Sequence, residues 1–206
     1  MSNPAAAKKG VRRFHPEVRK HMILDQAAAL VAAEGVSAVT MDRIARGAGV
    51  SKPLVYAYFQ NVTTLLQELL LRDQRRLWEA QTAAVSEAKD FDDLIRQTTR
   101  TYLQHIEKSG THIQRLMSEQ AVAAVFQERE QERRQRVVDF LAKEMARTLN
   151  VPREIANLVI ELSLGMTGAA GEMVSRGAVS RKKIEELLIC LYRGNAEALR
   201  AQYGKS

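Results

Sequence analysis

Residues 40–59 read Thr-Met-Asp-Arg-Ile-Ala-Arg-Gly-Ala-Gly-Val-Ser-Lys-Pro-Leu-Val-Tyr-Ala-Tyr-Phe. The stretch predicts a helix-turn-helix, in which a short helix, a glycine-containing turn and a second short helix follow one another. Thr40 and Ser51 are suitable N-caps for the two helices, and Gly47 and Gly49 permit the first helix to end abruptly. A proline in the first turn of the second helix is tolerated, because the N–H it lacks has no partner there.

The two faces of the second helix differ in character. Val55 and Phe59 lie four residues apart and are expected to point inward. The outer face is left to Lys52, Pro53, Leu54, Tyr56, Ala57 and Tyr58. Such a surface suits a DNA groove, because tyrosine hydroxyls can meet phosphates and methyl groups can meet thymine. The alternative is two amphipathic helices in an ordinary core, but the short turn, the caps and the basic surroundings together favour the motif.

The rest of the chain predicts an all-α protein of about nine helices in total. Of its 206 residues, 46% are hydrophobic, and it has only four prolines and eleven glycines. Helical spacing of apolar residues predicts a first helix from His15-Pro16 to Glu34-Gly35 and a fourth from Asn61 towards Ala88. Further helices are expected at 91–109, 112–120, 122–148, 152–176 and 181–202. Because the fourth helix continues directly from the motif, we expect it to act as a lever.

The net charge of +7 is unevenly distributed. Residues 1–60 hold nine Lys or Arg and four Asp or Glu, a net charge of +5, which leaves +2 for residues 61–206. This asymmetry is typical of a nucleic-acid-binding module joined to a nearly neutral domain, although an acidic membrane surface would attract the same end. The basic arm at residues 1–14 can equally be a solvated tail.

Small and apolar residues mark the last two helices as a dimer face. The residues expected there are Gly165, Gly168, Ala169, Ile184, Leu187, Leu188 and Leu191. Small side chains let another helix approach closely, and two copies of a recognition helix are the usual route to specificity. The same stripe can also be explained as the internal core of a helical hairpin.

Several classes of protein find no support in the sequence. The single cysteine, Cys190, cannot form an internal disulfide, and its apolar neighbours predict a buried side chain. Metal-binding, nucleophile-elbow and phosphate-loop motifs are missing, so we expect no enzyme, no metal and no cofactor. Without a signal peptide or a membrane span of about twenty apolar residues, the expected compartment is the cytoplasm.

The segment from Ile23 to Leu66 resembles the DNA-binding domain of the tetracycline-repressor (TetR) family of bacterial transcriptional regulators. The first helix of that domain is matched by Ile23-Leu24-Asp25, Ala27, Leu30 and Glu34-Gly35. Its second helix and turn are matched by Thr40, Ile44-Ala45 and Ala48-Gly49-Val50-Ser51. Its recognition helix is matched by Tyr56 and Tyr58-Phe59. Two positions depart from the family pattern. Val62 replaces a lysine that steadies a phosphate, and Val31 replaces an aromatic residue.

The resemblance implies roles for particular residues. Thr40, Arg43 and Ser51 would meet phosphates, Lys52, Pro53, Leu54 and Ala57 would face base edges, and Tyr56 and Tyr58 would contact the DNA backbone. Members of the family are generally homodimeric repressors that a small molecule releases from DNA. The implied division is a basic arm at 1–14, a DNA-binding domain at 15–60 and a ligand-binding and dimerisation domain at 61–206.

The effector pocket is expected among helices spanning residues 77–173. Its candidate residues are Trp78, Thr98, Tyr102, His105, Gln114, Met117, Phe126, Met166 and Met173. A methionine-containing apolar cavity favours a hydrophobic effector, although ordinary core packing explains each residue as well. The predicted partners are double-stranded operator DNA, a small-molecule effector and a second copy of the chain, with no membrane. The alternatives are a DNA-binding organiser without an effector, and a helical scaffold whose basic end meets a membrane or a partner.

Overall fold

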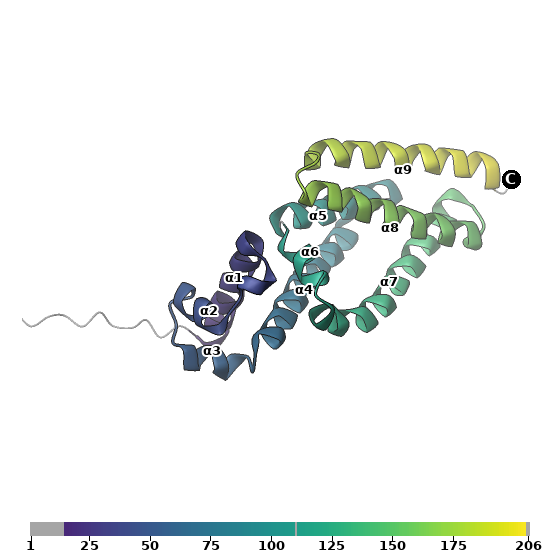
Figure 1. Cartoon of the computed structure of the whole chain (residues 1–206). Helices are drawn as coiled ribbons and strands as arrows, with labels where there is room; N and C mark the ends of the chain where they lie inside the picture. Colours follow the sequence, from purple (N-terminus) through teal and green to yellow (C-terminus); the bar gives the residue numbers. More distant parts are fainter. Residues whose placement is uncertain (1–14, 110, 205–206) are drawn as a thin grey trace, which may run out of the picture.

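The computed structural model describes residues 15–109 and 111–204, apart from the side chains of 125–130. The predicted all-α fold is confirmed, since this part of the chain contains helices and no strand (Figure 1). The helices are α1 (Pro16–Glu34), α2 (Met41–Gly47), α3 (Lys52–Tyr58), α4 (Val62–Glu87), α5 (Phe91–Ser109), α6 (His112–Met117), α7 (Gln120–Leu149), α8 (Arg153–Ser175) and α9 (Arg181–Tyr203), with a short 3₁₀ turn at Val36–Ala38. None of these helices is long and apolar enough to cross a membrane.

The first three helices share one core with the start of α4. Ile44 of α2, Val55 of α3 and Leu69 of α4 are all fully buried against α1. The same core reaches Leu116 of α6 and Val122 of α7. A three-helix unit of this size buries too little apolar surface to be very stable alone. The extension of its core into α4, α6 and α7 therefore ties the helix-turn-helix unit to the rest of the chain.

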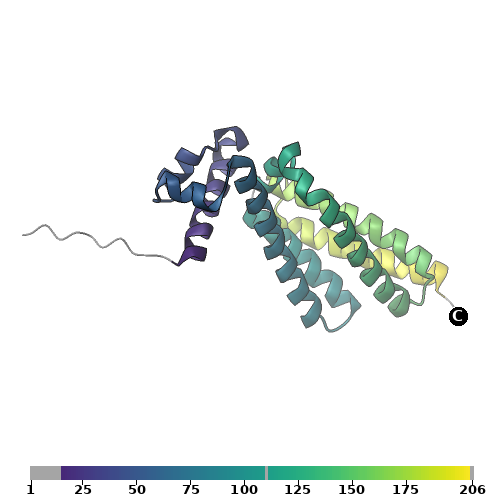
Figure 2. The same ribbon diagram turned by 90° about the horizontal axis from the view of Figure 1, so that it is seen from below.

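The remaining helices form a bundle in which α8 and α9 lie side by side on the outside (Figures 1 and 2). One apolar cluster joins α5, α7 and α8 around Ala142 and Ile160. A second joins α5, α8 and α9 around Leu103 and Leu188. The C-terminal end of α9 lies at the far end of the molecule from α2 and α3 (Figure 1).

Two glycines with positive φ end helices where the sequence predicts turns. Gly49 has φ 65° between α2 and α3, and Gly177 has φ 70° between α8 and α9. L-residues with a Cβ rarely adopt this conformation, whereas glycine does so without steric cost. The short turn of the helix-turn-helix therefore depends on Gly49 directly.

The last two helices differ from expectation in which side chains they bury. Ile184 and Leu188 pack inside the chain, so they are not available to a second copy. The prediction of a buried Cys190 is wrong, because its side chain is exposed on the same side of α9 as Leu187 and Leu191. Residues 184 and 188 share one face of α9, and residues 187, 190 and 191 share another. When the first face packs inside the chain, the second face is left exposed.

The small residues of α8 serve different purposes along the helix. A side chain at Gly171 would meet the ring of Tyr102 at 2.8 Å, so this glycine lets α5 approach α8. Gly165 and Gly168 have open space where a Cβ would lie. The close approach occurs between α5 and α8 at Gly171, and not along the whole row of small residues.

Candidate nucleic-acid interface and pocket

The second helix of the motif presents its expected outer face to solvent. Lys52, Pro53 and Ala57 are exposed, and Tyr56 is 49% exposed. Leu54 and Tyr58 are half-buried. Val55 and Phe59 are buried on the opposite side, which holds α3 with this face outward. Apart from the two half-buried side chains, the face expected to approach DNA is exposed to solvent.

The two N-caps of the motif differ in their hydrogen bonding. Thr40 Oγ1 accepts a hydrogen bond of 3.2 Å from the backbone N–H of Arg43. Its hydroxyl hydrogen still can be donated to a phosphate oxygen. Ser51 occupies the N-cap position of α3, but its side chain forms no capping bond, contrary to the sequence-based expectation. The Ser51 side chain is exposed.

Two residues expected to contact DNA are engaged within the protein. The guanidinium of Arg43 donates to Glu34 at 3.0 and 2.5 Å and to the carbonyl of Ala38 at 3.2 Å. The hydrogen bond from Arg43 lowers the pKa of the Glu34 carboxyl. The Tyr58 hydroxyl donates to the carbonyl of Pro16 at 3.0 Å. Phosphate oxygens only accept hydrogen bonds, so Tyr58 would have to give up its bond to Pro16 to donate to the DNA backbone. The guanidinium of Arg43 keeps N–H groups that its bonds to Glu34 and Ala38 do not use.

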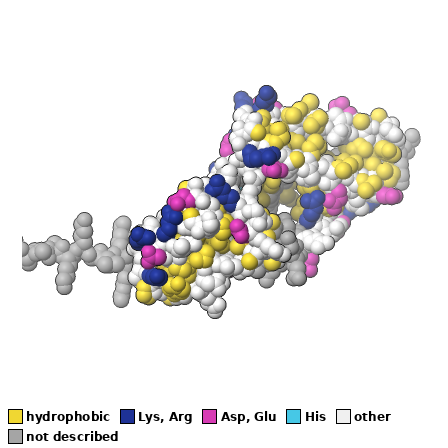
Figure 3. All heavy atoms as spheres, viewed as in Figure 1, with side chains coloured by type: hydrophobic (Ala, Val, Ile, Leu, Met, Phe, Trp, Pro, Cys, Tyr) yellow, Lys and Arg dark blue, Asp and Glu magenta, His cyan; other side chains and the backbone are white. Residues whose placement is uncertain are grey.

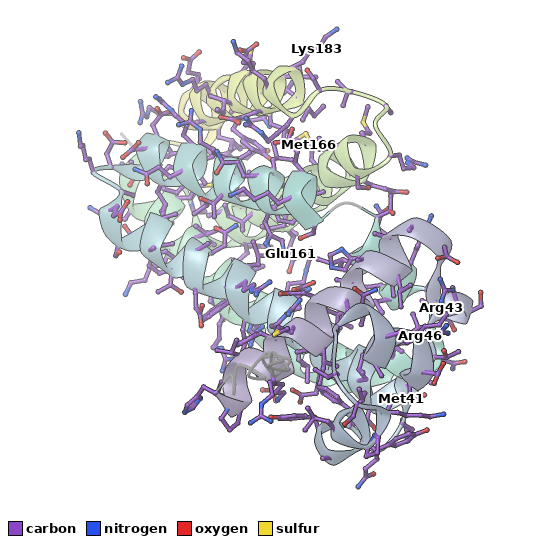
Figure 4. All side chains as sticks on the ribbon, turned by 90° about the vertical axis from the view of Figure 1, so that its left-hand side faces the viewer. Met41, Arg43, Arg46, Glu161, Met166 and Lys183 are labelled. Carbon is purple, nitrogen blue, oxygen red and sulfur yellow. The ribbon has the colours of Figure 1, made fainter. Side chains whose placement is uncertain are left out.

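A charged cluster of three residues on the motif was not identified from the sequence. The Asp42 carboxylate lies 3.1 Å from Arg46 Nη2 and 3.8 Å from Lys52 Nζ. Arg43 and Arg46 lie at the outer edge of the N-terminal domain (Figure 4). The i, i+4 spacing of Asp42 and Arg46 is the signal that could have indicated their pairing.

A cavity of about 530 Å³ lies among α4, α5, α6 and α8. Four of the predicted pocket residues line it, namely Tyr102, His105, Gln114 and Met117. The other lining residues are Gln74, Leu77, Ile106, Ile113, Ser118, Gly168, Gly171 and Glu172. The volume is in the range that holds a small organic molecule. The structure therefore brings together part of the predicted set from two separate helices, α5 and α6.

The other predicted pocket residues lie elsewhere. Trp78 is 41% exposed beneath the guanidinium of Arg133, whose central carbon is 4.9 Å from the ring centroid. The Thr98 hydroxyl donates to the Leu94 carbonyl at 2.7 Å. Met166, in α8, lines a second, smaller pocket between α8 and α9, and Met173 is 39% exposed. The side chain of Phe126 is outside the described part of the chain.

The pocket offers hydrogen-bonding groups beside its apolar wall. Burial raises the pKa of the Tyr102 hydroxyl and lowers the pKa of His105, so both side chains are neutral at pH 7. His105 Nε2 lies 3.3 Å from the hydroxyl oxygen of Ser109. A neutral imidazole has one donor and one acceptor. Such a lining can orient a molecule that has an apolar body and a polar group.

The pocket wall is bonded to the N-terminal domain through the short helix α6. Within α6, Ile113, Gln114 and Met117 face the pocket. Arg115, in the same helix, donates to the carbonyls of Val31 and Ala32 at the end of α1, at 2.6 and 2.9 Å. Movement of α6 would therefore change the lining of the pocket and also the hydrogen bonds from Arg115 to α1.

A buried hydrogen bond between side chains attaches α6 to α4. His112 Nε2 lies 2.5 Å from Asp73 Oδ2, and both residues are buried. Burial alone would raise the pKa of Asp73, but the hydrogen bond with His112 and nearby positive charges bring it below its ordinary value. Next to Asp73, Arg72 bonds to Asp25 of α1 at 2.7 Å. This connection between α1, α4 and α6 gave no signal in the sequence.

The structure defines a class of fold, an all-helical chain with an N-terminal helix-turn-helix and a second helical domain that contains a pocket. Residues 23–69 match the family described as bacterial regulatory proteins, tetR family. The resemblance to the TetR family is thereby confirmed, and the chain has the fold of a TetR-family transcriptional regulator.

Solved structures show the same fold over nearly the whole chain. A TetR-like transcriptional regulator from Rhodococcus sp. RHA1 is 24% identical, with a TM-score of 0.71 and coverage of 89% of this chain and 99% of that one. A TetR-family regulator from Streptomyces coelicolor is 16% identical, with a TM-score of 0.68 and coverage of 89% and 97%. The fatty acid degradation regulator FadR from Bacillus halodurans is 17% identical, with a TM-score of 0.68 and coverage of 86% and 97%. No curated protein shows significant sequence similarity to the chain.

Proposed function

We propose that this protein is a homodimeric repressor that binds a palindromic DNA operator and is released by a small, largely hydrophobic effector. The observation that carries the proposal is the bonding of α6, which lines the cavity through Gln114 and holds the end of α1 through Arg115. A molecule that fills the cavity would displace α6 and thereby tilt the DNA-binding domain. In this proposal, residues 15–60 bind DNA and residues 61–206 bind the ligand and form the dimer.

The outer face of α8 and α9 supports the homodimer. Large apolar side chains are exposed there, with Leu162 74% exposed, Leu158 58% and Leu187 51%. Hydrophobic side chains gather over this part of the molecule (Figure 3). Contiguous exposed apolar surface of this kind commonly marks a protein interface. A two-fold arrangement through this face would give the molecule two recognition helices, as a palindromic operator requires.

The chemistry of the cavity guides the choice of effector. Leu77, Ile106 and Met117 provide an apolar wall, and Tyr102 and His105 are neutral polar groups. The Bacillus halodurans relative is described as a regulator of fatty acid degradation, which makes acyl compounds a rational first group to screen. A compound that raises the melting temperature and also weakens DNA binding separates this proposal from a DNA-binding organiser without an effector.

Selection from a pool of random DNA duplexes tests the DNA-binding part. We expect an enriched site with two-fold symmetry, and failure to enrich any site would refute the regulator function. With that site, Tyr56→Phe should weaken binding to all sequences alike. Lys52→Ala should also relax the preference at one position of each half-site, at a cost of about 1–3 kcal/mol. If both variants keep wild-type affinity at the same salt concentration, α3 is not the recognition helix.

A further inference from the structure

The cavity among α4, α5, α6 and α8 has no positive group in the part of its wall that the structure describes. The described lining contains one acid, Glu172, and neither lysine nor arginine. His105 also lines the cavity, and burial lowers the pKa of its imidazole, so this side chain is neutral at pH 7. The negative charge of Asp73 acts in the opposite direction, but the effect of burial is larger. An anion placed in the cavity would therefore meet no cation among these groups.

The hydroxyl of Tyr102 is a hydrogen-bond donor that the described part of the chain does not use. Tyr102 lines the cavity from α5, and its hydroxyl forms no hydrogen bond with another described residue. Burial raises the pKa of the hydroxyl, so it keeps its proton at pH 7. A Cβ at Gly171 would lie 2.8 Å from the hydroxyl oxygen, so the ring rests directly against the backbone of α8. The donor is therefore held in place beside the cavity.

We infer that the effector is an electrically neutral molecule whose apolar body carries an ester or amide carbonyl, that this carbonyl accepts a hydrogen bond from Tyr102, and that carboxylates are excluded. The inference rests on the proposed function, which makes this cavity the effector site. Leu77, Ile106 and Met117 supply the apolar wall for the body of the molecule. The inference divides acyl compounds into neutral derivatives that bind and free acids that do not.

The reason for this selectivity is the difference in the cost of leaving water. A carbonyl group needs one donor to replace its hydrogen bond to water, and the Tyr102 hydroxyl supplies it. An ionised carboxylate loses far more solvation and needs a cation or several donors to compensate.

The solvent side of the cavity does not favour a charged group either. Glu172 is exposed there, so a carboxylate directed towards solvent would approach a second negative charge. Arg176 Nη2 lies 3.5 Å from the carboxylate of Glu172 and offsets part of that charge, so a cationic ligand gains little from Glu172. Neither sign of charge is therefore stabilised by the described lining.

Binding of three probes with the same apolar chain tests the charge preference. Methyl decanoate, decanoate and decylamine are titrated into the full-length protein at pH 7 and followed by calorimetry. We expect methyl decanoate to bind at least about tenfold more tightly than either charged probe. The ester is also the most apolar of the three, so a variant has to separate charge from general hydrophobicity.

The variant Gln114→Lys makes this separation, because it places a cation in the lining of the same cavity. Its affinity for decanoate should rise at least about tenfold, since a hydrogen bond to a charged group becomes available. Its affinity for methyl decanoate should change by less than about threefold, because the ester has no charge to pair with. Melting curves followed by circular dichroism establish that the variant is folded.

The role of the hydroxyl is tested by Tyr102→Phe, which keeps the ring beside Gly171. We expect the affinity for methyl decanoate to fall about three- to tenfold, the effect of one hydrogen bond. Tyr192→Phe is the matched control, because it removes a hydroxyl that donates to the Ser163 carbonyl at 3.0 Å, outside the cavity. This control should bind the ester as the wild-type protein does.

Four results would each overturn the inference. They are failure of methyl decanoate to bind, binding of a charged probe as tight as that of the ester, an unchanged ratio of ester to acid affinity in Gln114→Lys, and equal effects of Tyr102→Phe and Tyr192→Phe. None of these measurements requires DNA. A protein that prefers the ester but selects no DNA site would contradict the proposed function alone, whereas one that is released from its site by decanoate would contradict only this inference.

Discussion

Replacement of His112 by leucine should lower the free energy of unfolding by about 3 kcal/mol at pH 7. The substitution removes the hydrogen-bond partner of a buried carboxylate, and leaving a buried acceptor unsatisfied costs about 1–3 kcal/mol, or more when the acceptor is charged. We expect about 3 kcal/mol and not more because Asp73 keeps two cations nearby, with Arg72 Nε at 3.5 Å and Arg76 Nη1 at 3.7 Å. Since α6 is only six residues long, loss of this bond should loosen the whole helix.

A double-mutant cycle separates the pair from the effect of leucine itself. Asp73→Asn, His112→Leu and the double variant are unfolded in urea at one fixed protein concentration, followed by circular dichroism and by the fluorescence of Trp78, the single tryptophan. We expect a coupling energy of about 1.5–3 kcal/mol, the usual contribution of a hydrogen bond to a charged group. A coupling below about 0.5 kcal/mol would refute the argument that this bond attaches α6 to α4.

Three further predictions concern pH, the dimer and the turn of the motif. The folded-state pKa of Asp73 is lowered, so the contribution of Asp73 to stability is present above its unfolded pKa of about 3.9 and is lost as the pH falls through the folded value. Urea titrations between pH 6 and the acid range should show this loss of stability. The variant Asp73→Asn is the control, because it should not show the loss. Leu162→Glu should convert the proposed dimer to a monomer in sedimentation measurements, whereas Val18→Glu, which changes an exposed apolar residue of α1, should leave the wild-type oligomeric state unchanged. Gly49→Ala should lower the free energy of unfolding by about 1–2 kcal/mol, because φ is positive at this position. Gly49→Asn should lower it by less, since asparagine tolerates positive φ better than alanine. Equal losses of stability for the two variants in thermal unfolding would contradict this explanation.

The sequence was sufficient for features that depend on local chemistry. Thr40 caps α2, and Asn61 caps α4 by accepting a hydrogen bond of 2.8 Å from the backbone N–H of Thr64. Helical spacing placed Val55 and Phe59 on the inner face of α3, and both are buried. Such features involve residues within about four positions of one another, and the preferences that govern them are readable from the chain.

The features that could not be predicted depend on contacts between distant segments. The bond between Arg43 and Glu34, nine residues earlier, was not predicted, and it forms once α1 and α2 pack together. Cys190 was expected to be buried because its neighbours in sequence are apolar. The rotation of α9 that buries Leu188 instead leaves Cys190 outside. The pairing of Asp73 with His112 joins residues 39 positions apart, and no local pattern indicates it.

The bonds between α1 and the helices that carry the pocket set a scale for the proposed ligand response. They include Arg115 to the end of α1, Arg72 to Asp25 at 2.7 Å, and Lys20 to Glu68 at 2.9 Å. A shift between two states from 1:99 to 99:1 requires about 5.5 kcal/mol of preferential binding to one of them. A hydrogen bond to a charged group contributes about 1.5–3 kcal/mol, and an exposed ion pair at most about 1 kcal/mol. Exchange of the two Arg115 hydrogen bonds when α6 moves, together with the bonds between α1 and α4, is therefore of the size that a regulatory switch requires, so α6 and α4 would both carry the signal.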